Sequence, residues 1–262
     1  MSDVPQDDGA GRAAPDPSGR AETDASTRAE TDAVRVRYAR RAPADDRYRL
    51  THPAALMAMQ ERQRAMLALF ARQGFADLGT LRLVEVGSGG GGNLLELLQL
   101  GFRPEHLAGI ELLPERHAAA RARLPEAVRL TCGDASAEPV APGSVDIVLV
   151  STVFSSLLDD AFQQRLAATM WQWLRPGGGV LWYDFTVDNP RNPDVRGMPV
   201  ARIRTLFPEA RLEHRRVTLA PPIARAVCRI QPAAYTLLNT LPFLRTHALC
   251  WLGKSGSARV ES

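Results

Sequence analysis

The sequence predicts an α/β protein whose mostly parallel sheet is covered by helices on both faces. Two observations support this fold class. Short apolar segments alternate with helical segments between residues 81 and 185, and a glycine-rich turn at residues 87–92 separates the first such pair. This alternation is typical of parallel strands joined by helical crossovers. Ligands of such sheets bind at the carboxyl ends of the strands, so we expect the chemistry at that edge.

The N-terminal part is predicted to be a tail followed by a flap and a helix. Residues 1–33 are mainly Asp, Ala, Gly, Pro, Ser and Thr, so we expect a disordered tail without a chemical role. Residues 34–80 are assigned to the flap and the helix. Residues 53–74 end on a glycine and carry apolar residues at helical spacing, namely Leu56, Met59, Met66, Leu67 and Phe70.

Residues 81–254 are predicted to form the core, and residues 255–262 a C-terminal tail. Apolar segments predict strands at 81–86, 107–112, 128–134, 145–151, 178–185, 211–220 and 246–253. Helices are predicted at 93–102, 114–124, 160–174 and 198–208, and a proline-punctuated helical segment at 221–242. Residues 186–210 and 221–245 are insertions on the acceptor side. If the last strand is antiparallel, His247 lies at the binding edge.

Composition excludes several classes of protein. The chain has 262 residues, 45% hydrophobic and 23% charged, which is typical of a globular protein in water. Its net charge of +3 is spread along the chain without a basic block, so we expect no nucleic-acid partner. No apolar stretch predicts a signal peptide or a membrane span. Cys132, Cys228 and Cys250 are widely spaced, so we expect neither a metal site nor a disulfide framework, and a cytoplasmic location.

The glycine turn indicates a ligand only when its companions are considered. Such a turn lets a ligand approach the backbone at a helix N-terminus. Gly87, Gly89 and Gly92 also satisfy the nicotinamide dinucleotide pattern, which leaves that cofactor open. The companions are acidic residues near the ends of the first three strands and a Pro-Gly-Gly turn before the fifth. The acids are Glu85, Glu111 and Asp134, and the turn lies within residues 174–179.

This set, over residues 81–185, resembles the class I S-adenosylmethionine-dependent methyltransferases. The resemblance implies a Rossmann-like sheet of seven strands with a reversed last strand, and S-adenosylmethionine as cofactor. It suggests that Glu85 holds the amino group, Glu111 the ribose and Asp134 the adenine, and that Ser151 and Thr152 lie near the sulfonium. The cofactor-binding set that it implies is Glu85, Gly87, Ser88, Gly89, Gly91, Glu111, Leu112, Asp134, Ala135, Ser151 and Thr152.

Two residues are candidates for acting on the methyl acceptor. A sulfonium already activates its methyl group, so a base is needed mainly when a hydroxyl must lose its proton. Asp184 ends the fifth strand, and His247 opens the reversed strand with an imidazole suited to proton removal near neutrality. The alternatives are that Asp184 caps a loop and that His247 is structural. Tyr38 and Tyr48 are candidates for a flap over the cofactor.

The predicted reaction is methyl transfer to a hydroxyl of a small molecule or glycan. Residues 183–247 are also similar to a bacterial methyltransferase subgroup linked to polysaccharide and secondary-metabolite biosynthesis. An N- or C-methyltransferase, an NAD(P)-dependent oxidoreductase and a binding protein without turnover remain alternatives. The apolar faces of residues 221–245 either shape the acceptor pocket or pack in a homodimer.

Overall fold

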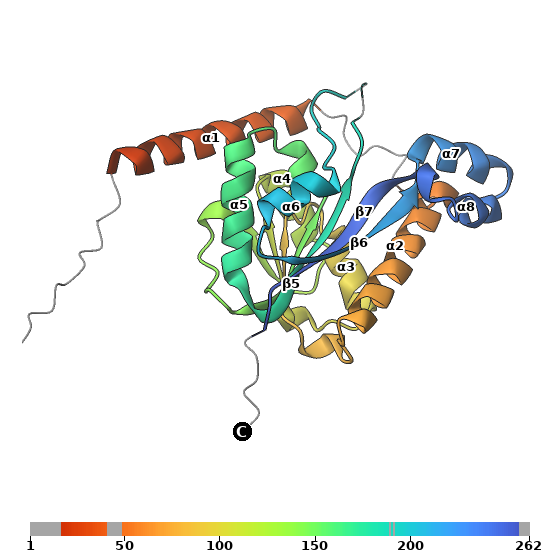
Figure 1. Cartoon of the computed structure of the whole chain (residues 1–262), viewed down its shortest axis with the longest axis horizontal. Coiled ribbons are helices and arrows are strands. Elements are labelled where there is room, and N and C mark those ends of the chain that lie inside the picture. Colours follow the sequence, from red (N-terminus) through yellow and green to blue (C-terminus); the bar gives the residue numbers. More distant parts are fainter. Residues whose placement is uncertain (1–16, 41–48, 189, 191, 257–262) are drawn as a thin grey trace, which may run out of the picture.

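A seven-stranded sheet with the order β3-β2-β1-β4-β5-β7-β6 forms the centre of the molecule (Figure 1). The computed structural model describes residues 17–40, 49–188, 190 and 192–256. The strands are β1 (Leu83–Val86), β2 (Leu107–Glu111), β3 (Arg129–Cys132), β4 (Val145–Ser151), β5 (Leu174–Phe185), β6 (Arg211–Leu219) and β7 (Arg245–Gly253). Strand β7 is antiparallel to both neighbours, and the pairs among β1 to β5 are parallel. The predicted mostly parallel sheet with a reversed last strand is confirmed.

Helices cover both faces of this sheet. They are α1 (Pro17–Ala39), α2 (Pro53–Arg72), α3 (Gly92–Gln99), α4 (Pro114–Arg121), α5 (Asp160–Trp173), α6 (Val200–Leu206), α7 (Pro221–Ile230) and α8 (Ala233–Leu238). Side chains of β5 alternate between two buried clusters, as the period of a strand requires. Val180 and Trp182 face the cluster with α1, α5 and α6, while Leu181 and Tyr183 face the cluster with α2, α3 and α4.

Helix α1 overturns the expectation of a tail without structure. The prediction is wrong for residues 17–33, which lie within α1, while residues 1–16 lie outside the described residues. Residues 20–42 contain neither Gly nor Pro and are rich in Ala and Arg, which favour helix. Packing then stabilises the helix, because Glu30, Thr31 and Val34 are buried against the core. In Figure 1, α1 runs across the top of α5.

Helix α2 begins at the predicted proline, but its buried face is narrower than expected. The helix ends at Arg72, and Gly74 follows with a φ of 76°. The buried side chains are Ala65, Met66, Leu69 and Phe70. Leu56 and Leu67 are exposed, in contrast to the prediction, because the helix turns them away from the sheet.

Strand β5 begins earlier than predicted and contains the Pro-Gly-Gly segment. Leu174 pairs with Val145, and the register then shifts so that Gly179 pairs with Ile147. A side chain on Gly179 would place its Cβ 2.5 Å from the Trp251 ring. Glycine at this position therefore lets β7 approach β5 closely.

The insertion at residues 221–245 is helical, as predicted, and packs on α2. Helix α7 follows the carboxyl end of β6, and α8 leads to the start of β7. A small cluster of Leu219, Ala224, Cys228 and Tyr235 holds both helices against the first turns of α2. The chain's three cysteines are free thiols. Within the described ranges, no helix is long and apolar enough to cross a membrane.

Candidate active site

The glycine turn between β1 and α3 is shaped by close contacts with neighbouring loops. Gly87, Gly89 and Gly91 have φ values of 69°, 55° and 77°, which favour glycine. A Cβ on Gly87 would lie 2.5 Å from Val153 Cγ2. A Cβ on Gly91 would lie 2.7 Å from Leu124 Cδ1. The turn therefore packs directly on the segments after β4 and α4.

Glu85 lies beneath this turn and is fully buried. Its Oε1 accepts a 2.6 Å hydrogen bond from Asn93 Nδ2. Within the described part of the chain, its buried Oε2 has no hydrogen-bond partner. Burial raises the pKa of this carboxyl to about 8, although Asn93 and Arg62 oppose the shift. The geometry leaves one carboxylate oxygen in need of a donor or a cation.

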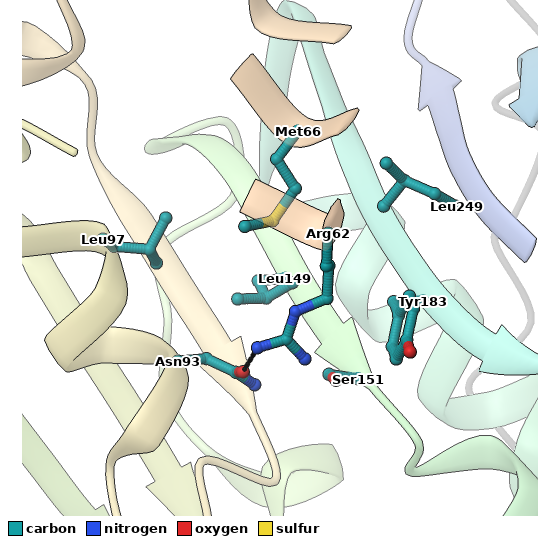
Figure 2. Close-up of a pocket in the computed structure, with 8 residues that line it drawn as sticks. All are labelled: Arg62, Met66, Asn93, Leu97, Leu149, Ser151, Tyr183 and Leu249. Carbon is teal, nitrogen blue, oxygen red and sulfur yellow. Dashed lines mark hydrogen bonds between the residues drawn. The ribbon is translucent and has the colours of Figure 1, made fainter. Parts of the chain in front are cut away.

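Arg62 of α2 reaches into the same region and completes a polar network (Figure 2). Its guanidinium donates to Asn93 Oδ1 at 2.9 Å and to Glu96 Oε1 at 2.7 Å. It also lies over the ring of Tyr183 in β5, with Cζ 5.2 Å from the ring centroid. Arg62 thus ties α2 to α3 and β5 at the carboxyl edge of the sheet.

Glu111, at the end of β2, is buried and held by two backbone donors. Its Oε2 accepts from Gly89 N at 2.7 Å, and its Oε1 accepts from Leu113 N at 2.9 Å. A carboxylate offers about four acceptor positions in all. Each oxygen therefore keeps one acceptor position for a further donor.

Asp134 follows β3 and has a similar arrangement. Its Oδ1 accepts from Ser136 N at 2.8 Å, so the carboxylate caps the short helix Ala135–Ala137. This matches the turn-forming role that is common for Asp at such a position. The cap uses only Oδ1, so Asp134 can cap this helix and still contact a ligand through its other carboxylate oxygen.

An open pocket of about 770 Å³, part of it exposed to solvent, lies over the carboxyl ends of β1, β2, β3 and β4. Seven of the predicted cofactor residues line it, namely Gly87, Glu111, Leu112, Asp134, Ala135, Ser151 and Thr152. Glu85, Ser88, Gly89 and Gly91 are not among its lining residues. Much of the remaining wall is apolar, with Val86, Ile110, Leu113, Val153, Leu157, Phe162 and Leu166.

Helix α1 forms one wall of this pocket through Thr31, Val34 and Tyr38. The Tyr38 ring lies beneath the Arg116 guanidinium, whose Cζ is 5.0 Å from the ring centroid. Tyr38, predicted as part of a flap over the cofactor, lines the pocket, and its role toward a cofactor stays a prediction, whereas Tyr48 lies outside the described residues. Thr31, which falls within the segment expected to have no chemical role, also lines the pocket.

Hydrogen bonds fasten α1 to the loop after β4. Glu30 Oε1 accepts from Leu158 N at 2.9 Å and from the Arg37 guanidinium at 2.6 Å. Arg37 also donates to Ser156 O at 3.0 Å. This wall is therefore held by a buried ion pair and by backbone contacts that are distant in sequence.

A second, smaller cavity adjoins the pocket and shares Ser151 with it (Figure 2). Its lining residues are Arg62, Met66, Asn93, Leu97, Leu149, Ser151, Tyr183 and Leu249. Sequence reasoning missed Arg62 and Asn93. The available signals were an arginine within an otherwise apolar helix face and a polar residue in the first turn of α3.

Asp184 is buried beneath the loop after β4 and lines neither cavity. Its Oδ2 accepts from Ser155 N at 3.1 Å, and its Oδ1 accepts from Phe185 N at 2.9 Å. Burial raises the pKa of this carboxyl to about 7. The geometry favours the loop-capping alternative.

His247 lies at the carboxyl edge, where it pairs with Phe185 across β5 and β7. Its ring stacks on Tyr183, with centroids 4.9 Å apart, and its Nδ1 lies 3.0 Å from Thr246 Oγ1. Burial and the charge of Arg62 lower the pKa of His247 to about 4, so the ring is neutral near pH 7. The histidine lines neither cavity, which favours the structural alternative.

Comparison with known proteins identifies the domain and the fold. Residues 83–178 match the family model described as a methyltransferase domain. No curated protein matches the chain. An S-adenosylmethionine dependent methyltransferase from Mesorhizobium loti is 17% identical with a TM-score of 0.54, over 75% of this chain and 98% of that one.

Two further structures share this fold at similar identity. Phosphoethanolamine N-methyltransferase 2 of Haemonchus contortus, in complex with S-adenosyl-L-methionine, is 16% identical with a TM-score of 0.53, over 73% of this chain and 52% of that one. The (4+2)-cyclase SpnF is 17% identical with a TM-score of 0.54, over 76% of this chain and 83% of that one. At these identities the likeness concerns the fold alone.

Proposed function

The chain carries a methyltransferase domain with the fold of the class I S-adenosylmethionine-dependent methyltransferases, and from this premise we propose its reaction. The chain binds S-adenosylmethionine in the open pocket and transfers its methyl group to a hydroxyl of a small molecule or glycan. One observation carries the cofactor assignment. Glu111 and Asp134 line the same pocket from neighbouring strands, and each has carboxylate oxygen capacity that backbone donors leave unused.

The position of Glu111 fits a ribose. Its two backbone hydrogen bonds fix the orientation of the carboxylate at the rim of the pocket. One remaining acceptor position on each oxygen suits two neighbouring hydroxyls. Such charge-assisted hydrogen bonds are among the stronger polar contacts in proteins.

The surroundings of Asp134 fit a purine. The free oxygen of this carboxylate can accept from an exocyclic amine, while Leu112 and Ala135 beside it offer apolar surface to a flat ring. Phe162 and Leu166 of α5 extend this apolar wall. The combination of a few placed polar groups with apolar walls is typical of cofactor sites.

Glu85 fits the amino end of the cofactor. Its unpartnered Oε2 is buried under the glycine turn, where an ammonium group, directly or through water, would stabilise the charged carboxylate. Neighbouring Asn93 and Arg62 hold the other side of this region. We therefore assign the methionine part to the boundary between the pocket and the small cavity, at Ser151.

The reaction needs alignment and exclusion of water more than a base. S-adenosylmethionine supplies, when bound, a methyl group that its sulfonium already activates. Helix α1 and the loop after β4 shield the pocket, and Ser151 and Thr152 form the floor where β4 ends. Asp184 and His247 remain candidates for proton removal, although their hydrogen bonds and burial favour roles in holding loops. An acceptor hydroxyl would then be positioned in line with the methyl group, and its proton would pass to solvent at the open side of the pocket as the new O–C bond forms.

Calorimetric titration of the full chain with S-adenosylhomocysteine and, separately, with NADH tests the cofactor. We expect binding of the first alone, and binding of NADH alone would support the oxidoreductase alternative. Transfer is then followed with methyl-labelled S-adenosylmethionine and matched acceptors that differ only in carrying a hydroxyl or an amine. Labelled ether products support the proposal, and labelled amines would support N-methylation. Cofactor binding without any labelled product would indicate a binding protein or another reaction on this fold.

A further inference from the structure

The most exposed apolar side chains of the described residues lie on the insertion that contains α7 and α8. Ile230 is 90% exposed, Phe243 73% and Leu237 71%. Large apolar side chains elsewhere in the described ranges reach at most 54%, at Val187. Scattered exposed apolar residues are ordinary on a protein surface, but a cluster at one protruding segment indicates a contact site.

Charge on this insertion has a single sign. Residues 214–260 contain no Asp or Glu, whereas residues 221–245 include Arg225, Arg229 and Arg245. Arg229 is exposed, and Arg225 is half-buried. The segment therefore combines exposed apolar side chains with positive charge and offers no carboxylate to pair with it.

Helix α7 is amphipathic, and its inner face is already occupied. Ala224 and Cys228 are buried in the cluster that joins the insertion to α2. Arg225 and Arg229 follow these residues by one position and lie away from that face. Ile230 lies at the end of the helix, beyond the cluster. Its apolar side chain is therefore not part of the packing that holds the insertion on α2.

We propose that the α7–α8 insertion docks on an anionic lipid surface. Apolar side chains of Ile230, Leu237 and Phe243 would enter the boundary between headgroups and acyl chains, while Arg225 and Arg229 would pair with lipid phosphates. Segments that combine an apolar face with Arg or Lys bind membrane surfaces in this way.

The same observations disfavour a second copy of the chain as the partner that covers the α7–α8 insertion. A twofold-symmetric contact through this insertion would bring each surface against an identical one. The interface would then gather Arg225 and Arg229 of both copies, and the insertion has no acidic residue to neutralise them. Anionic headgroups remove this repulsion.

The insertion occupies the same edge of the sheet as the pocket. It leaves the sheet at the carboxyl end of β6 and returns at the start of β7, where Ala220 N donates to Leu244 O at 2.8 Å. Figure 1 shows α7 and α8 projecting from this edge, beside α2. Docking would place the carboxyl edge of the sheet, and with it the pocket, near the lipid surface.

Sedimentation of the full chain with lipid vesicles tests the proposal without any cofactor. We expect the protein to pellet with vesicles of phosphatidylcholine and phosphatidylglycerol, to pellet less in high salt, and to stay in solution with phosphatidylcholine alone. The triple variant Ile230→Ser, Leu237→Ser, Phe243→Ser should lower the partition coefficient at least about tenfold, because apolar side chains carry much of interfacial binding. The matched control is Leu67→Ser, an exposed leucine on α2 that should have no effect.

Arg229→Gln should weaken binding to the anionic vesicles about fivefold and leave circular dichroism unchanged. This single variant and Ile230→Ser keep the test decisive if the triple variant does not fold. Absence of pelleting with anionic vesicles, or equal pelleting of the wild type and these variants, would overturn the proposal. Light scattering that shows a dimer, converted to monomers by Ile230→Ser, would overturn it in favour of a second copy.

Discussion

Glu85 gives the sharpest prediction, because its buried carboxyl couples both folding and ligand binding to the uptake or release of a proton. The perturbation is Glu85→Gln, which keeps the shape and removes the ionisation. In the folded chain the pKa of Glu85 is about 8, against an ordinary value of 4.5. The folded state therefore binds more protons than the unfolded state between these two pH values, so the stability of the ligand-free wild type falls as pH rises through this window.

The magnitude of the stability change follows from the width of the pH range between the two pKa values. Each pH unit inside it changes the free energy of unfolding by about 1.4 kcal/mol, so the wild type should lose about 3 kcal/mol relative to Glu85→Gln between pH 5.5 and pH 8. Urea unfolding of both proteins at several pH values measures this difference, since other titrating groups are common to both. A parallel pH dependence of the two proteins would refute the assignment of a raised pKa to Glu85.

Ligand binding supplies a second measurement on the same carboxyl. An ammonium group near Glu85 would favour the charged form, so binding of S-adenosylhomocysteine at pH 7 should release about one proton. Calorimetry in buffers with different ionisation enthalpies counts this proton. The release should disappear in Glu85→Gln, and proton uptake by the wild type would contradict the placement of the amino group.

The other predictions concern the pocket and the two candidate catalytic residues. Glu111→Ala should weaken S-adenosylhomocysteine binding about 5- to 150-fold, equivalent to about 1 to 3 kcal/mol, by calorimetry, and unchanged affinity would remove Glu111 from the site. Val34→Asp should also weaken this binding, because it places a charge in the buried wall formed by α1. Asp184→Asn should lower the free energy of unfolding by about 1 to 3 kcal/mol while turnover persists, since one amide donor would face a backbone N–H; loss of turnover at full stability would instead support catalysis. His247→Ala should keep the pH profile of turnover above pH 6, because the imidazole is already neutral there, and loss of the acidic limb of that profile would support a role as base.

Much of the fold could be predicted because the periodicities of strands and helices appear within short stretches of the sequence. The alternating segments and the reversed β7 were predictable, as were the residues of the glycine turn. The early start of β5 was not, because it depends on the pairing of Leu174 with Val145 of β4 and on the register shift that follows. Such a contact joins residues that are distant in sequence, and local propensity carries no information about it.

In the candidate site too, some residues could be predicted from the sequence and others could not. Glu111 and Asp134 end neighbouring strands, and topology alone brings them to one pocket. Arg62 stands out as an arginine on an apolar helix face, but its contacts with Asn93 and Glu96 could not be predicted, because they depend on how α2 packs against α3. His247 was placed at the correct edge, yet its ring stacks on Tyr183 and lines neither cavity. Strand order thus fixes where a residue lies along an edge, while packing decides which way its side chain faces.

Because helix α1 forms part of the pocket, the shortest fragment of this protein that keeps a complete pocket must include that helix. The match to the methyltransferase family model starts at residue 83, but a chain trimmed to that point would lack the wall made by Thr31, Val34 and Tyr38. It would also lack Arg62 and the helix that covers the other face of the sheet. A shortened protein of this kind would expose apolar core to water and leave the pocket open on one side. Expression of an isolated domain should therefore start before residue 26, so that the contacts of Ser26 and Thr27 with Arg165 of α5 are retained.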